Sequence, residues 1–80
     1  MSRCRVFLTF PQRLINEPII YDIGQRFDIV TNIRGASVTD ETALVALQLE
    51  GQQAEIDTAI AYMVDRGVKV ESLESDESEE

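Results

Sequence analysis

Asn32 and Arg34 carry the most useful polar chemistry in this chain of 80 residues, because they lie two positions apart in an alternating segment. Residues i and i+2 of a strand share one face, so both side chains lie together. The Asn32 amide offers two donors and an acceptor, which suits the ammonium and carboxylate groups of an amino acid. An arginine grips a carboxylate through two parallel hydrogen bonds. The pair predicts a small polar pocket at a dimer seam, with Phe7 and Leu44 as apolar walls.

A structural role for Asn32 stays open beside this one. In that alternative, its amide satisfies a hydrogen bond at a strand end or a bulge.

Catalytic groups are few. Cys4 is the single cysteine and histidine is absent, so no side chain is available as its usual activating base. Asp40 and Glu41 are adjacent carboxylates that we expect to be solvated. The same composition lacks the four Cys or His ligands of a zinc site, the cysteines of an iron–sulfur centre and a glycine-rich phosphate loop. We expect no enzyme activity, no metal and no cofactor.

The charge is concentrated at the end of the chain. The run at residues 74–80 holds five acids and no base, and taking these five from the formal net charge of −8 leaves −3 for the rest. Nucleic-acid binding needs a basic face, which seven scattered Lys and Arg residues do not form. We expect one domain at residues 1–73 and a disordered, solubilising acidic tail at 74–80. A contact between this tail and a basic partner protein is the alternative.

The length and apolar content of the chain indicate where it is located and whether it self-associates. No stretch approaches the roughly 20 apolar residues that span a bilayer, so we expect no membrane insertion. A lone cysteine fits a reducing compartment, which favours the cytoplasm. A domain this small buries only about 60% of its unfolded surface, so self-association into a dimer or a higher oligomer is expected.

The hydrophobic pattern alternates with period two in four segments and follows helical spacing in two. Asn16 is the expected cap of the first helix, and Gly24 within it is expected to allow close packing on a sheet. Gly67 is placed to end the second helix. The predicted elements are a strand at 5–10, a helix at 19–27, strands at 29–34 and 43–50, a helix at 53–66 and a strand at 68–70.

This order predicts a ferredoxin-like βαββαβ fold of the α+β class. Right-handed crossovers give a four-stranded antiparallel sheet with both helices on one face. The other face is left open, and a monomer rarely exposes a large apolar patch without use. We expect this face to be a dimer or ligand surface, the alternative being a half-solvated sheet. Its predicted interface residues are Phe7, Val30, Leu44 and Ala46.

The segment from Arg5 to about Leu73 also resembles a known family, the NIL domain. The similarity rests on the order of several short stretches rather than on one motif. They are Val6-Phe7-Leu8-Thr9-Phe10, Glu17-Pro18-Ile19-Ile20, Gln25-Arg26-Phe27, Thr31-Asn32-Ile33, Leu47-Gln48-Leu49-Glu50-Gly51 and Gly67-Val68-Lys69-Val70-Glu71.

The resemblance implies a bacterial ferredoxin-like domain related to ACT regulatory domains, paired with a second copy through sheet surfaces. In methionine importers the family's domain sits at the C-terminus of the ATPase subunit, binds methionine and restrains transport. The asparagine of the name motif Asn-Ile-Leu belongs to that binding region, and Asn32 matches it here. The motif reads Asn32-Ile33-Arg34 in this chain, so a charged arginine replaces the apolar leucine beside the implied pocket. We expect Asn32, Ile33 and Arg34 to be the ligand-binding residues.

Two functions follow as expectations. The first is a regulatory module that binds an amino acid such as methionine, or a similar metabolite, at a homodimer interface. The alternative is a protein-interaction module that supports a transporter or a ferredoxin-type partner without a ligand of its own.

Overall fold

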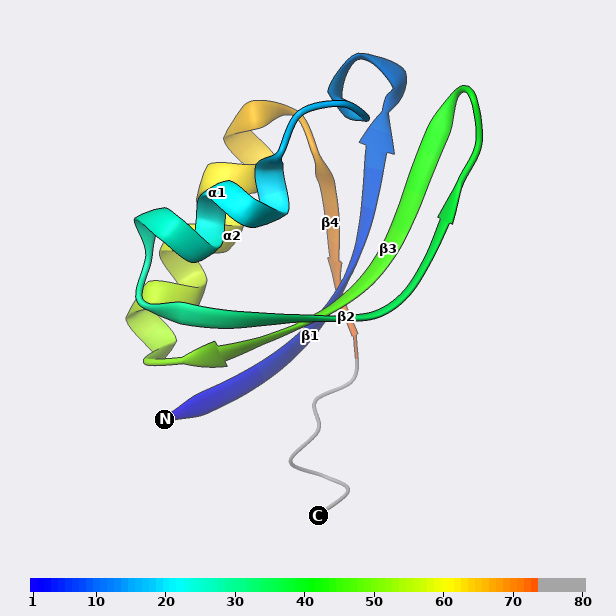
Figure 1. Cartoon of the computed structure of the whole chain (residues 1–80). Helices are drawn as coiled ribbons and strands as arrows, with labels where there is room; N and C mark the ends of the chain where they lie inside the picture. The colour runs from blue at the N-terminus through cyan, green and yellow to red at the C-terminus, as the bar shows by residue number, and fades with distance from the viewer. Residues whose placement is uncertain (74–80) are drawn as a thin grey trace.

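The computed structural model describes residues 1–73, so the acidic tail expected at 74–80 lies outside the described residues. The elements follow the predicted order, which confirms the ferredoxin-like arrangement (Figure 1). They are β1 (Ser2–Pro11), the short 3-10 helix η1 (Gln12–Leu14), α1 (Ile19–Arg26), β2 (Ile29–Val38), β3 (Thr42–Gly51), α2 (Gln53–Arg66) and β4 (Lys69–Ser72).

The four strands form one antiparallel sheet in the order β2-β3-β1-β4. β1 and β3 pair over their full length in the centre, while β4 pairs with only Val6–Thr9 of β1. Both helices lie on the same side of the sheet, as predicted (Figure 1). The other side of the sheet is therefore the open face.

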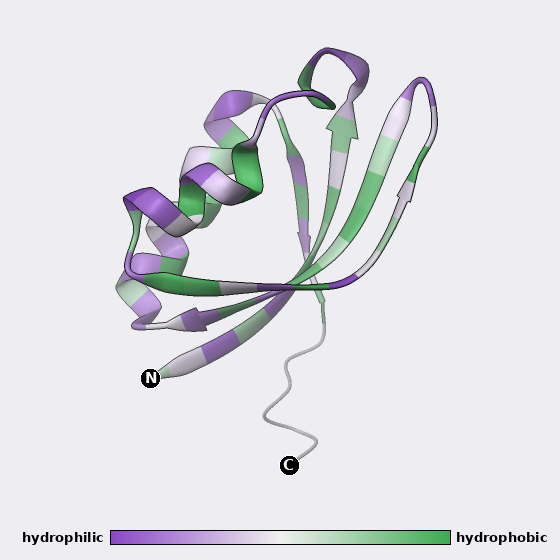
Figure 2. Ribbon diagram, in the orientation of Figure 1, coloured by the Kyte–Doolittle hydropathy of each residue, from purple (hydrophilic) through white to green (hydrophobic). Residues whose placement is uncertain are grey.

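The core lies between the helices and the covered face of the sheet. Alternate residues of β1 and β3 point into it, and helical stripes of α1 and α2 meet them. In the N-terminal half of β1, this alternation is visible as bands of opposite hydropathy (Figure 2). The largest fully buried side chains are Leu8, Ile19, Ile23, Leu47, Leu49, Ile56, Met63 and Val6.

The end of α2 confirms the cap predicted at Gly67. This glycine has a left-handed φ of 110°, and its N–H donates to the last turn of the helix, at the carbonyls of Met63 and Val64. Val68 then donates to the Met63 carbonyl over 3.0 Å, which turns the chain toward β4. These bonds form the glycine-dependent helix ending that the sequence indicated.

Two expectations about α1 are wrong. Pro18, not Asn16, occupies the cap position, and no side chain caps the helix there. The chain first makes the turn of η1, so the helix starts where Pro18 presets the backbone. Gly24 does not serve close packing either, because a Cβ added there would meet nothing within 4 Å.

β2 is longer than predicted. The alternation was expected to stop at Arg34, yet the strand continues to Val38, and β3 begins at Thr42. The pairing with β3 shifts by one residue between Ile33 and Gly35, so Arg34 is an extra residue at a β-bulge. A bulge breaks the two-residue period while leaving the strand intact, and this break looked like a strand end in the sequence.

Candidate functional site

The open face is polar in the half that contains Asn32. Asn32 lies opposite Gln48 of β3, and Gln48 lies opposite Arg5 of β1. The Gln48 amide donates to the Glu50 carboxylate over 3.0 Å, and Arg3 forms an ion pair with the same carboxylate at 3.2 Å. Asn32 therefore borders a connected set of polar and charged side chains.

The other half of the open face is apolar but small. Phe7 lies opposite Ala46, and Leu44 lies opposite Thr9, all four being half-buried. Val30, the fourth expected interface residue, lies at the polar end opposite Glu50 and is 64% exposed. The apolar part of this face thus reduces to Phe7, Leu44 and Ala46.

The structure separates Asn32, Ile33 and Arg34, the three expected ligand-binding residues. Asn32 belongs to the open face, whereas Ile33 lies opposite the core residue Leu47. Arg34 is the extra residue of the bulge, and all three side chains are exposed. Asn32 and the expected wall at Phe7 share the open face, but they lie on strands separated by β3.

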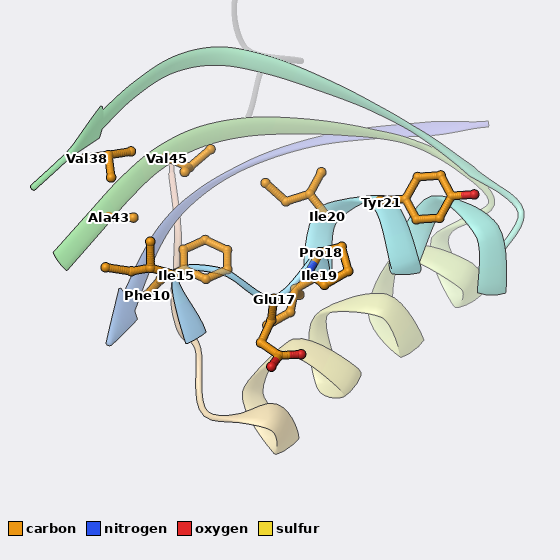
Figure 3. Close-up of a pocket in the computed structure, with 10 residues that line it drawn as sticks. All are labelled: Phe10, Ile15, Glu17, Pro18, Ile19, Ile20, Tyr21, Val38, Ala43 and Val45. Atoms are coloured by element: carbon orange, nitrogen blue, oxygen red, sulfur yellow. The ribbon is translucent and has the colours of Figure 1, made fainter. Parts of the chain in front are cut away.

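A pocket of about 280 Å³ lies on the covered face, away from Asn32 (Figure 3). Its floor is made by Phe10, Ala43 and Val45, which are core residues. Ile20 points toward these strands from the start of α1 (Figure 3). The complete lining is Phe10, Ile15, Glu17, Pro18, Ile19, Ile20, Tyr21, Val38, Ala43 and Val45.

The pocket exists because α1 is too short to cover the sheet. Eight helical residues span about 12 Å, whereas ten strand residues span about 33 Å. The far end of the β2–β3 hairpin therefore extends beyond the helix, and the loop before α1 covers it only in part. Two lining side chains remain largely in solvent, Val38 at 63% and Tyr21 at 66% exposed.

Hydrogen bonds hold the rim of this pocket. At the hairpin tip the Thr39 hydroxyl accepts the N–H groups of Glu41 and Thr42, at 3.2 and 3.1 Å. The Gln12 amide donates to the Asp40 carbonyl over 3.2 Å and so joins the tip to η1. The hairpin end is thus attached to the loop that forms the opposite rim.

A cluster around Tyr62 fixes α1 against α2. The guanidinium carbons of Arg26 and Arg66 lie 5.0 and 5.7 Å from the centroid of the Tyr62 ring, and Phe27 meets the ring edge-on. Arg66 donates to the Tyr62 hydroxyl over 2.9 Å, which raises the pKa of the Arg66 guanidinium. Arg66 also pairs with the pocket residue Glu17 at 3.4 Å.

The ion pair between Glu17 and Arg66 makes the pocket lining more apolar. The Glu17 carboxylate points away from the strands, toward α2 (Figure 3). The lining that remains is almost wholly apolar, with the Tyr21 hydroxyl as a further polar group. The pocket can therefore hold an apolar group, and polar parts of a ligand have to lie at its mouth.

Sequence reasoning missed this pocket because it looked for a site on the open face. One signal was present in the sequence. Ile19 and Ile20 are adjacent, so their side chains leave α1 in directions about 100° apart. Ile19 is 1% exposed and Ile20 is partly buried, and both line the pocket.

Among residues 1–73, no group of three or more Cys, His, Asp or Glu side chains could hold a metal ion. No helix in the same range is long and apolar enough to cross a membrane.

Comparisons with known proteins agree with the fold. The model of the NIL domain family matches residues 4–72. The C-terminal domain of an ABC transporter ATP-binding protein from Enterococcus faecalis has a similar structure, with a TM-score of 0.76 and 23% sequence identity. The similarity covers 88% of this chain and 82% of that one. No curated protein matches the chain.

Proposed function

Because the chain belongs to the NIL domain family, we propose that it is a non-enzymatic regulatory module that binds a small metabolite. The ligand is an amino acid such as methionine, or a molecule of similar size with an apolar part. It binds at the interface of a homodimer, in the cytoplasm. The observation that carries this proposal is the apolar pocket between α1 and the β2–β3 hairpin.

The size of the pocket favours a ligand shared between two molecules. Ligand sites commonly have volumes of about 300–1,000 Å³ and bury most of the ligand. This pocket, at about 280 Å³, lies just below that range, and Val38 and Tyr21 leave its mouth open. It holds one apolar side chain, and a second protomer closes the mouth over the rest of the ligand.

The chemistry of the lining favours an unbranched or small branched apolar side chain. Core residues form the floor, so no desolvated polar group is available there to pair with a charged one. A thioether such as that of methionine adapts well to an irregular apolar space. The amino and carboxylate groups stay at the mouth, where they keep contact with water or with the second protomer.

Asn32 and Arg34 are the proposed source of polar contacts. Asn32 lies on the open face and Arg34 at the bulge, and neither lines the pocket of its own chain, so the contribution of both depends on the dimer. Edge strand β2 carries both residues as well as Val38 of the pocket. A second protomer that packs beside β2 brings its own polar pair toward the mouth.

A binding experiment with matched variants tests the proposal. Isothermal titration with methionine, leucine, glutamate and arginine identifies the ligand class. The variant Ala43→Leu fills the floor of the pocket, and Ala61→Leu adds the same volume on the exposed face of α2. We expect Ala43→Leu to weaken binding at least tenfold and Ala61→Leu to leave it unchanged, provided that both variants fold.

Thermal unfolding supplies the folding control and an independent measure of binding. A ligand at about 100 times its dissociation constant stabilises the fold by about 2.7 kcal/mol. If the two leucine variants bind the ligand with equal affinity, the pocket is not the ligand site. We propose that Asn32 contacts the ligand only from the second protomer. If Asn32→Ala weakens binding to the monomer as much as to the dimer, a ligand site shared between two protomers is contradicted.

A second function rests on a different observation. β2 is an edge strand of ten residues, and Val30, Ile33 and Val38 along it are more than half exposed. Exposed strand edges accept strands of other proteins. The similar domain from Enterococcus faecalis belongs to a transporter ATP-binding protein, so a protein partner of this class is the alternative. If no metabolite in a screen raises the unfolding temperature of the chain, the protein-interaction function is favoured over metabolite binding.

A further inference from the structure

Glu17 is the single charged side chain in the described lining of the pocket. Two hydrogen bonds hold its backbone in the loop before α1. The Glu17 N–H donates to the Leu14 carbonyl over 3.1 Å, and the Glu17 carbonyl accepts the Ile19 N–H over 2.8 Å. The side chain itself is 49% exposed. Glu17 therefore belongs to the mouth of the pocket and not to its floor.

The ion pair with Arg66 holds the Glu17 carboxylate loosely. Arg66 contacts only the oxygen Oε1, at 3.4 Å, whereas strong hydrogen bonds between charged groups measure about 2.8 Å. Within residues 1–73, no other side chain contacts this carboxylate. An ion pair as exposed as this one contributes little to stability. The free energy needed to separate Glu17 from Arg66 is therefore small.

Arg66 keeps other contacts when Glu17 leaves it. Its guanidinium donates to the Tyr62 hydroxyl over 2.9 Å and lies 5.7 Å from the centroid of the Tyr62 ring. Tyr62 also raises the pKa of the Arg66 guanidinium more than Glu17 does. Separation of the ion pair thus leaves Arg66 with a hydrogen bond and a cation–π contact.

The chemistry of the mouth favours a cationic group on the ligand. Core residues form the floor, so a charged group of the ligand has to find its partner at the mouth. A carboxylate only accepts hydrogen bonds, whereas an ammonium group has three donors and no acceptor. Glu17 matches an ammonium group in both charge and hydrogen bonding.

We propose that the Glu17 carboxylate turns from Arg66 to the pocket mouth when a ligand binds, and there accepts hydrogen bonds from a primary ammonium group of the ligand. The carboxylate points toward α2 in the structure (Figure 3), so this change is a rotation of one side chain. The inference rests on the proposed function, because it concerns the same pocket. It narrows the ligand class to amines with an apolar substituent, which include the apolar amino acids.

Three ligands and one pair of variants test the contact by isothermal titration. Methionine carries an amine and a carboxylate, methioninol carries the amine alone, and γ-methylthiobutyrate carries the carboxylate alone. We expect Glu17→Gln to weaken the binding of both amines about fivefold, without weakening that of γ-methylthiobutyrate. Asp22→Asn is the matched control, because it removes the same charge from α1 outside the pocket lining. It should leave all three affinities nearly unchanged.

Arg66→Met tests the exchange of partners. Without the competing guanidinium, Glu17 is free to turn to the ligand, so methionine should bind about twofold more tightly. Arg26→Met is the control, because Arg26 also lies over the Tyr62 ring, at 5.0 Å, but is not part of the ion pair with Glu17. Unchanged or weaker binding of methionine to Arg66→Met overturns the exchange.

The remaining outcomes separate this contact from the proposed function. If the natural chain binds γ-methylthiobutyrate as tightly as methionine, or if Glu17→Gln weakens all three ligands equally, the amine contact is wrong. If Glu17→Gln leaves methionine binding unchanged while Ala43→Leu weakens it, the pocket remains the site and only the amine contact is overturned. If none of the three ligands binds the natural chain, the proposed function is contradicted together with this contact.

Discussion

Val38 and Ala43 lie opposite each other at the end of the β2–β3 hairpin, and they differ sharply in exposure. Ala43 is 6% exposed, whereas Val38 is 63% exposed, and both line the same pocket. Directly paired residues on one face normally share one environment. Here the sheet passes from core to pocket mouth within a single pair, because Ala43 lies on the inner strand β3 and Val38 on the edge strand β2. The proposed ligand site follows from this transition.

The core is expected to dominate stability, and Leu47→Ala tests it. Leu47 is 1% exposed in the centre of the sheet, so its truncation should lower the free energy of unfolding by about 2–5 kcal/mol. Urea denaturation measures the change. Val30→Ala, at a residue 64% exposed, should cost less than about 0.5 kcal/mol. Equal costs for the two variants would mean that the covered face is not the core.

Two glycines should respond to alanine with opposite signs. Gly67 has a φ of 110°, and an added Cβ would also meet the Arg13 guanidinium, so Gly67→Ala should destabilise by about 1–2 kcal/mol. Gly24 lies inside α1 with open space around it, so Gly24→Ala should stabilise by about 0.5–1 kcal/mol. Thermal unfolding of both variants checks the signs. A destabilising Gly24→Ala would reveal a contact at α1 that the structure lacks.

The Tyr62 cluster should contribute a measurable coupling between the helices. A double-mutant cycle with Tyr62→Phe and Arg66→Met isolates the hydrogen bond of 2.9 Å and the change in the ring's interaction with the cation. We expect a small favourable coupling energy, since the contact is partly exposed. Because the pKa of Arg66 is raised above an already high value, the coupling should not change between pH 6 and pH 9. A coupling energy of zero would contradict the cluster.

The hairpin tip should matter for the pocket more than for the fold. Thr39→Val removes the hydroxyl that accepts two backbone N–H groups at the rim. We expect it to lower the free energy of unfolding by about 1 kcal/mol and to weaken ligand binding, since the rim loses its geometry. Thr58→Val is a control, because its hydroxyl donates within α2, far along the chain from the rim. Equal effects of both variants on ligand affinity would contradict the role of the rim.

The fold was predictable because the periodicities in the chain agree with one another. Residues 53–66 showed one apolar stripe followed by Gly67, and α2 occupies that range. Val6, Leu8 and Phe10 alternate without interruption, and all three are buried. Local patterns of this kind suffice where one face of an element meets one core.

The site was harder to predict because it depends on relative lengths and on a bulge. The pattern alone did not show that β2 continues past Arg34, since the bulge shifts the alternation there. The pocket arises where a short helix leaves a long hairpin uncovered. Its lining comes from β1, the loop before α1, α1, β2 and β3, so no single local pattern reveals it.

The most direct test of the proposed function is an NMR titration of the ¹⁵N-labelled chain with methionine. If the ligand occupies the pocket, the shifts should be largest at Ile20, Val38 and Ala43, and saturate together with a single dissociation constant. Ala43→Leu should abolish them, while Ala61→Leu, on the exposed face of α2, preserves them. Shifts confined to the open face around Asn32 and Gln48, with Val38 and Ala43 unmoved, would contradict the account.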